Sequence, residues 1–178
     1  MAVVKPVVFQ VVGYQNSGKT TFIEKIIEEL AAIGLKTAVI KHHGHGGKPN
    51  VCEQKDSTRH VEAGAAATIV EGDGRLLLHA EGKRYDLHDQ VQLLGFFQPE
   101  VILIEGYKFA EHPKVALIKT LTEAHLLHKL ENIQAVVYWE DSIKEYVQTI
   151  MAIPCFSISN SKAITFIVQW LKKQVNEI

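Results

Sequence analysis

Residues 7–20 of the chain read VVFQVVGYQNSGKT, and this stretch predicts a strand, a phosphate-binding turn and the start of a helix. β-Branched and aromatic side chains dominate residues 7–12, as they do in buried strands. Residues 13–20 then follow the pattern G-x-x-x-x-G-K-T, whose glycines let successive backbone N–H groups turn inward around a phosphate chain. A helix follows, because apolar side chains recur every three or four residues from Phe22 to Ile33 and Gly34 provides a stop.

The residues of the predicted turn and helix start share one expected role, the binding of nucleotide phosphates: Gly13, Tyr14, Gln15, Asn16, Ser17, Gly18, Lys19, Thr20 and Thr21. Lys19 supplies a positive charge for the β and γ phosphates, and the Thr20 hydroxyl is a ligand for Mg²⁺. The positive end of the helix dipole faces the same phosphates. The alternative is a glycine-rich turn without a ligand, since roughly one random chain in a hundred of this length would carry the pattern. The strand before the turn and the helix after it favour the nucleotide site.

The rest of the chain alternates extended and helical patterns. Further strands are expected at 35–41, 101–104, 115–119, 135–139 and 155–158, and further helices from Asp56 to about 65 and at 88–94, 123–130, 142–151 and 162–175. Two extended runs, 67–71 and 75–80, flank Gly72-Asp73-Gly74 and predict a β-hairpin. The order predicts an α/β fold of the P-loop NTPase type, with a mainly parallel sheet, helices on both faces and an appended β-hairpin. A single nucleotide-binding domain is expected over 1–178, with the hairpin inserted at about 67–81.

Composition excludes several classes of protein. The 178 residues are 47% hydrophobic and carry 19 basic and 20 acidic side chains, a net charge of −1 that gives no electrostatic reason to expect nucleic-acid or anionic-membrane binding. Cys52 and Cys155 are far apart and lack a C-x-x-C spacing, which argues against a disulfide framework and a zinc ribbon and favours a reducing compartment. No apolar run approaches the 18 residues of a membrane span.

The carboxyl ends of parallel strands face one crevice, so residues that follow the predicted strands are candidates for the same site. Glu105 follows the apolar run 101–104 and is expected to hold Mg²⁺ with Thr20, directly or through water. Gly106 then offers an unhindered N–H near a γ-phosphate. A solvated residue at a strand end is the alternative for Glu105.

The segment after the second predicted strand is rich in histidine and glycine. Lys41, His42, His43 and His45, with Cys52 nearby, could form a metal site, could contact phosphate or a partner, or could be a solvated loop. No H-x-x-x-H or C-x-x-C pair is present to favour the metal site over the other two. Asp56 could cap the next helix or could reach Mg²⁺ or a polarised water.

Arginine is scarce, because Arg59, Arg75 and Arg84 are the only three in the chain. Small-molecule kinases need arginine clamps on the phosphoryl group, so this scarcity argues against them and leaves Arg59 as a candidate for γ-phosphate or partner contact. Phe166, Trp170 and Leu171 fall at helical spacing and are more simply explained as core than as a base-stacking platform. An N-K-x-D motif that would read guanine is absent, and Asp141 and Asn160 are the remaining candidates for base recognition.

These motifs together resemble the molybdopterin-guanine dinucleotide biosynthesis protein B (MobB) family. The resemblance covers about residues 7–119 and rests on residues 13–20, on Lys41-His42-His43, on Asp56-Ser57 with Arg59, on Ala63-Gly64-Ala65 and on Glu105-Gly106-Tyr107-Lys108. It implies a cytoplasmic homodimer that binds GTP with Mg²⁺ and assists the guanylyltransferase that joins GMP to molybdopterin, with molybdopterin itself as a further candidate ligand. It implies at most weak GTP hydrolysis.

Two other functions remain open. A small-molecule P-loop kinase would transfer phosphate rapidly to an acceptor, and a metal-delivery GTPase would use the histidine-rich loop. Exposed hairpin edges invite pairing between two chains, so the predicted hairpin is a candidate dimer element.

Overall fold

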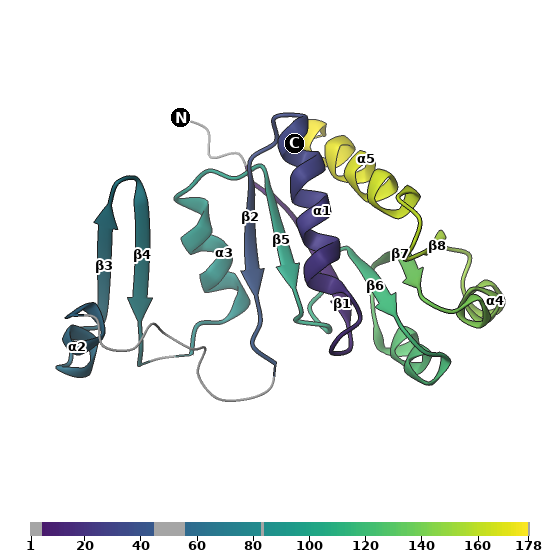
Figure 1. Ribbon diagram of the computed structural model, residues 1–178, viewed down its shortest axis with the longest axis horizontal. Coiled ribbons are helices and arrows are strands. Elements are labelled where there is room, and N and C mark those ends of the chain that lie inside the picture. Colours follow the sequence, from purple (N-terminus) through teal and green to yellow (C-terminus); the bar gives the residue numbers. More distant parts are fainter. Residues whose placement is uncertain (1–4, 45–55, 83, 178) are drawn as a thin grey trace.

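The computed structural model describes residues 5–44, 56–82 and 84–177. Its centre is a six-stranded sheet in which every neighbouring pair of strands is parallel (Figure 1). The strands, in their order across the sheet, are β2 (Thr37–Lys41), β5 (Val101–Glu105), β1 (Val7–Gly13), β6 (Lys114–Ile118), β7 (Ile133–Tyr138) and β8 (Cys155–Ser157). This arrangement confirms the predicted α/β fold with a mainly parallel sheet.

Helices cover both faces of the sheet, as the sequence predicted. Helices α1 (Lys19–Ala32) and α5 (Lys162–Asn176) lie on one face; α3 (Leu87–Gly95), the 3₁₀ segment η1 (Leu121–Lys129) and α4 (Asp141–Ile150) pack on the other. Alternation along β1 decides the partners, since Phe9 and Val11 face the α1 side while Val12 faces the η1 side. Every residue of 101–104 is fully buried, which confirms the expectation of a strand covered on both faces.

Gly34 ends helix α1, as the sequence predicted. The N–H of Gly34 donates to the carbonyl of Ala31 and the N–H of Leu35 donates to that of Leu30, with Gly34 at a φ of 79°. This pattern is a Schellman cap, in which the residue after the left-handed glycine completes the helix end. The N–H of Leu35 therefore closes the cap of α1, and β2 begins at Thr37 instead of residue 35.

The hairpin forms a sheet of its own. Strands β3 (Ala67–Gly72) and β4 (Arg75–Ala80) are antiparallel, and the turn residues Asp73 and Gly74 have φ values of 51° and 77°. Positive φ at both central residues is the requirement of a tight type I′ turn. Helix α2 (Asp56–Glu62) packs on this hairpin, with the Thr68 hydroxyl donating to the Ser57 carbonyl at 3.3 Å. The predicted hairpin is thus confirmed as an appendage beside the parallel sheet, beyond α3 in Figure 1.

One helical element differs in type. Residues 121–129 form a 3₁₀ helix where an ordinary helix was expected over 123–130. Ala124, Leu126 and Leu127 are buried. The spacing of apolar residues therefore predicted a helix with one buried side, but it did not distinguish a 3₁₀ helix from an α-helix. Among the described helices, none is both long enough and apolar enough to span a bilayer.

Candidate phosphate-binding cleft

A cleft of about 920 Å³ opens at the carboxyl ends of β1, β2 and β5. Most of the residues expected at the site line it: Gly13, Gln15, Asn16, Gly18, Lys19, Thr20, Thr21, Lys41, His42, His43, Glu105 and Gly106. Strand register explains this convergence, because Glu105 lies opposite Val11 on one side and Lys41 on the other. The rule that ligands bind at the carboxyl ends of parallel strands therefore placed these residues together correctly.

The phosphate loop, residues 13–20, has the backbone that an anion cradle needs. Asn16 and Gly18 have φ values of 58° and 90°, so the chain reverses between β1 and α1. A Cβ on Gly13 would lie 2.5 Å from the Leu117 carbonyl oxygen and 2.7 Å from the Ser17 hydroxyl. Helix α1 starts without a side-chain cap and without an acidic residue in its first turn. Its first N–H groups and the positive end of its dipole are thus directed at the loop.

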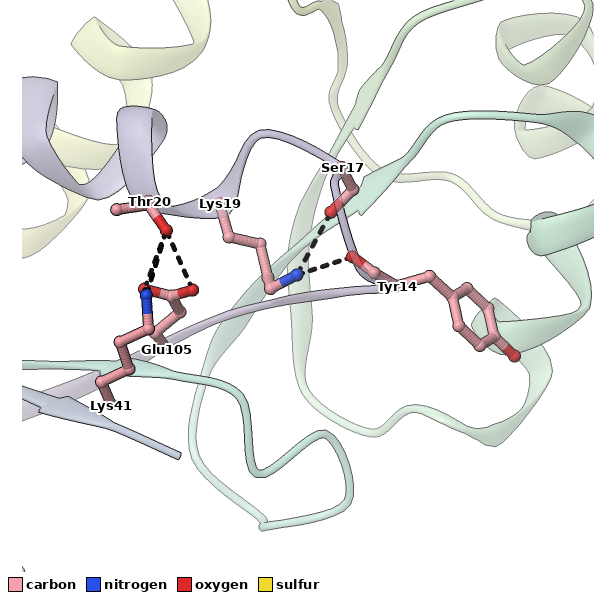
Figure 2. Close-up of polar contacts among 6 residues, drawn as sticks. All are labelled: Tyr14, Ser17, Lys19, Thr20, Lys41 and Glu105. Carbon is pink, nitrogen blue, oxygen red and sulfur yellow. Dashed lines mark hydrogen bonds and ion pairs between the residues drawn. The ribbon is translucent and has the colours of Figure 1, made fainter. Parts of the chain in front are cut away.

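Lys19 bends back over the phosphate loop. Its ammonium donates to the Tyr14 carbonyl at 2.6 Å and to the Ser17 hydroxyl at 3.5 Å, and Figure 2 shows it between these two groups. Burial lowers the pKa of Lys19 from its ordinary value, while the negative charge of Glu105 opposes this effect. The lysine is therefore held as a positioned donor inside the loop.

Thr20 and Glu105 bring two oxygen ligands together. The Thr20 hydroxyl lies 3.1 and 3.3 Å from the two carboxylate oxygens of Glu105, and the Lys41 ammonium lies 3.3 Å from Glu105 Oε2 and 3.4 Å from Thr20 Oγ1 (Figure 2). The positive Lys41 ammonium thus contacts one oxygen of Thr20 and one oxygen of Glu105. Hydroxyl and carboxylate oxygens are the donors that Mg²⁺ prefers, so these residues fit the expected ion.

The charge of the cleft differs from that of the whole chain. Lys19, Lys41 and Lys108 line it, and Glu105 is the acidic residue among its described lining residues. The chain as a whole carries a net charge of −1. Positive charge is therefore concentrated where the phosphate loop opens, which suits a polyanionic ligand.

The loop after β5 is anchored from inside the sheet. The Gln10 side-chain amide donates to the Gly106 carbonyl at 3.1 Å and to the Tyr107 carbonyl at 2.7 Å. Tyr107 has a φ of 49°, stacks on His42 with ring centroids 4.3 Å apart, and accepts a hydrogen bond from Gln90 at 2.6 Å. The Gly106 N–H donates to the Val11 carbonyl at 3.1 Å. Contact between this N–H and a γ-phosphate would therefore require that bond to open.

Two aromatic residues lie at the site: Tyr14, which the sequence already placed in the phosphate loop, and Trp139, which the sequence did not single out. Trp139 follows β7 and donates its indole N–H to the Ser17 carbonyl at 3.1 Å, and Tyr14 donates to or accepts from His125 Nε2 at 2.9 Å. The Lys108 ammonium lies 4.1 Å from the centre of the Tyr14 ring. Trp139 looked like the last core residue of a strand, yet its place after a carboxyl end was a signal that could have found it.

Other candidates lie elsewhere. Arg59 is on α2 beside the hairpin and is absent from the described lining of the cleft, so its contact with phosphate or a partner stays a prediction. Asp56 is the first residue of α2. His45 and Cys52 lie outside the described residues, and within those that are described no cluster of three metal-binding side chains occurs. Asn160 lines a neighbouring hollow, which Asp141 does not line.

A known protein family matches most of this chain. The model of the family described as molybdopterin guanine dinucleotide synthesis protein B matches residues 8–139. A probable molybdopterin-guanine dinucleotide biosynthesis adapter protein of Bacillus subtilis is 40% identical over 174 residues, which cover 97% of this chain and 98% of that protein. Both matches include the phosphate loop, Lys41 and Glu105.

Solved structures agree with the fold. The crystal structure of Bacillus subtilis MobB has a TM-score of 0.76 and 38% identity, and the alignment covers 92% of this chain and 96% of that one. The hydrogenase maturation factor HypB from Archaeoglobus fulgidus has a TM-score of 0.52 at 14% identity, covering 95% of this chain and 89% of that one. The second likeness shows a shared fold alone.

Proposed function

The chain belongs to the molybdopterin guanine dinucleotide synthesis protein B family, and from this premise we propose that it is a GTP- and Mg²⁺-binding adapter in molybdenum cofactor biosynthesis. An adapter of this kind assists a guanylyltransferase that attaches GMP to molybdopterin. The observation that carries the nucleotide part is the phosphate loop, with Lys19 inside it and the Thr20–Glu105 pair beside it. The adapter role is supported by the matched family and by the Bacillus subtilis relative.

Each part of the cleft has an expected task. The backbone of residues 13–18 and the Lys19 ammonium hold the phosphates, and Thr20 and Glu105 hold Mg²⁺. When bound, the ion neutralises charge on the β and γ phosphates. Lys41 and His42 lie beside this position and are candidates for the γ-phosphate or for the partner protein. Asp56 and Arg59, on α2, are candidates for contact with the γ-phosphate or with the partner.

A binding role is favoured over rapid phosphate transfer. Phosphoryl-transfer enzymes stabilise the transferring group with arginine side chains, and the described residues that line this cleft include no arginine. Hydrolysis of GTP is therefore expected to be weak at most. Rapid phosphate transfer to an added small molecule would favour the kinase alternative instead.

Preference for GTP follows from the family premise, as does the partner guanylyltransferase. Molybdopterin is a second candidate ligand, since it also carries a phosphate. We also expect a single domain over 1–178 and a cytoplasmic location.

A metal-delivery role is the other alternative. It would require bound metal that is lost on substitution of His42, His43 and His45, which elemental analysis of purified protein would reveal.

The hairpin is the proposed dimer element. Ile69, Leu76 and Leu78 share one face of it and are 64%, 43% and 42% exposed. Thr68, which contacts α2, lies on the opposite face, where Val70 and Leu77 are also 46% and 52% exposed. A two-stranded sheet with exposed apolar side chains is marginally stable on its own, so pairing with a second copy would bury side chains that α2 leaves exposed.

Substitution of the phosphate-loop lysine tests the nucleotide assignment. Lys19→Ala removes the charged donor, and GTP–Mg²⁺ affinity in calorimetry is expected to fall about 100-fold or more, with an unchanged circular dichroism spectrum. Lys173→Ala is the matched control, because Lys173 lies on α5 and is 73% exposed. Retained affinity in Lys19→Ala would reject the assignment.

A further inference from the structure

We propose that the hollow between α1 and the β8–α5 loop binds the base of a 6-oxopurine nucleotide, with Trp139 as the stacking surface and the Asn160 amide as the hydrogen-bond donor. The inference rests on the proposed nucleotide site, because it requires the phosphates to lie in the phosphate loop. It adds the residues that choose the base.

The hollow is continuous with the phosphate-binding cleft. Its volume is about 470 Å³, within the usual range of small-molecule pockets. Gly18, Thr21 and Trp139 line both spaces, so the hollow begins where the phosphate loop enters α1. The loop of Ser159, Asn160 and Ser161, between β8 and α5, also lines it. A nucleotide with phosphates on residues 13–20 therefore has room for its nucleoside on this side.

Trp139 presents an aromatic ring at the junction. Trp139 is 46% exposed, whereas tryptophan is a largely buried residue in most proteins. The hydrogen bond from its indole N–H to the Ser17 carbonyl, at 3.1 Å, ties it to the phosphate loop. The Lys119 ammonium lies 5.6 Å from the ring centre. The indole is thus fixed in place with a surface open to ligand, as a stacking platform for a base requires.

Asn160 has its amide orientation set by the backbone. Its Oδ1 accepts from the Lys162 N–H at 2.9 Å, which assigns the oxygen to the loop and leaves the Nδ2 amine as the end that donates to a ligand. The Asn160 N–H donates to the Ser157 carbonyl at 3.0 Å, so the loop around it is also fixed. Lys162 then opens α5.

A donor on this loop discriminates between purines. Guanine presents O6 and N7 as acceptors, while adenine has an amino group in place of O6. An Asn160 amine facing position 6 would bond to a 6-oxopurine and would meet a second donor in adenine. The residue therefore provides base selection without the N-K-x-D motif, which this chain lacks.

The first test compares four ligands in the presence of Mg²⁺: GTP, ITP, ATP and inorganic tripolyphosphate. GTP and ITP should bind the wild-type chain with similar affinity, because both have O6, and ATP should bind about tenfold more weakly or worse. Equal affinity for GTP and ATP would overturn the inference while leaving the phosphate site intact. Failure of every ligand to bind, tripolyphosphate included, would overturn the proposed function and the inference together.

The second test uses variants of the two residues. Trp139→Leu should weaken GTP binding about 5- to 100-fold and leave tripolyphosphate binding unchanged, whereas Trp139→Phe should keep most of the GTP affinity. Phe96→Leu is the control, since Phe96 is 81% exposed at the end of α3. Equal losses for GTP and tripolyphosphate in both Trp139 variants would mean that the indole only supports the phosphate loop, and would overturn the stacking role.

Asn160→Asp completes the set. The carboxylate can still accept from the Lys162 N–H, so the loop is retained, but the donor is lost. The ratio of GTP affinity to ATP affinity should fall about tenfold, and the tripolyphosphate affinity reports the effect of the added charge alone. An unchanged ratio would rule out Asn160 as the residue that selects the base.

Discussion

Gly13 is the residue at which sequence and packing agree most closely. The motif required glycine there, and the structure gives the physical reason, since a Cβ would press against the main chain of β6. The same motif pointed to Lys19 and Thr20, and the position after a strand pointed to Glu105; all three line the cleft. It could not identify the hydrogen bond from Trp139 to Ser17, because the motif defines the loop but not the side chains that fold over it.

Gly13→Ala is expected to destabilise the protein. The added methyl would lie 2.5 Å from the Leu117 carbonyl oxygen, and relief requires a shift of backbone in the centre of the sheet. The free energy of unfolding should fall by about 1–3 kcal/mol in urea denaturation. Gly95→Ala is the control, because a Cβ there meets no atom within 4 Å and alanine favours a helix. Equal stability of the two variants would contradict the steric argument.

The pKa of Lys19 predicts how phosphate binding depends on pH. Burial lowers this pKa in the free protein, so the ammonium is lost at a lower pH than an ordinary lysine would lose it. Bound phosphate favours the charged form, so affinity should fall as pH rises through the lowered pKa. Calorimetry with tripolyphosphate from about pH 7 to about pH 10 measures the fall. Lys19→Arg keeps its charge over this range, and a profile as steep as that of the wild type would exclude Lys19 as the titrating group.

At the scale of elements, the sequence predicted which segments are strands and helices better than where they begin or how they pair. Hydrophobic patterns with a period of two or 3.6 residues show which side chains are buried, and this locates most strands and helices. They do not report that Leu35 completes a Schellman cap or that residues 121–129 wind more tightly. The order β2-β5-β1-β6-β7-β8 depends on crossovers between distant segments, so it required the structure.

The hairpin predicts a change in oligomeric state. Ile69→Lys places a charge among the exposed apolar side chains of β3 and β4, where Ile69 is 64% exposed, and should shift a dimer towards monomer on light scattering. Deletion of residues 72–81 should have the same effect. Leu93→Lys on α3, where the leucine is 53% exposed, is the matched control and should leave the mass unchanged. A dimer that survives both hairpin changes would exclude this element as the interface.

At the scale of the whole molecule, the sequence could predict those parts of the candidate site that lie at the carboxyl ends of strands. Glu105 and Lys41 converge because their strands are neighbours, and the rule for parallel sheets anticipates this. The rule does not apply to Arg59, because α2 packs on the separate hairpin. The hollow beside Trp139 could not be predicted from the sequence either, because it forms between segments more than a hundred residues apart.

Ligand binding should stabilise the whole fold. At a hundredfold excess over Kd, GTP–Mg²⁺ would add about 2.7 kcal/mol to the free energy of unfolding, which for a chain of this size raises Tm by about 5–11 °C. Scanning calorimetry should show this shift for the wild type and its absence for Lys19→Ala. A single transition is expected if residues 1–178 form one domain. An equal shift in the lysine variant would place the nucleotide elsewhere.

The Gln10 anchor has a consequence for protein engineering. Its two hydrogen bonds end on main-chain carbonyls of residues 106 and 107, so they do not depend on which side chains that loop carries. Gly106 itself is constrained by a φ of 102°, but the following side chains of Lys108 and Phe109 form part of the cleft wall. Residues 108 and 109 could therefore be substituted one at a time while Gln10 keeps the backbone of the loop in place. The loop is thus a practical starting point for engineering the protein to bind other anions.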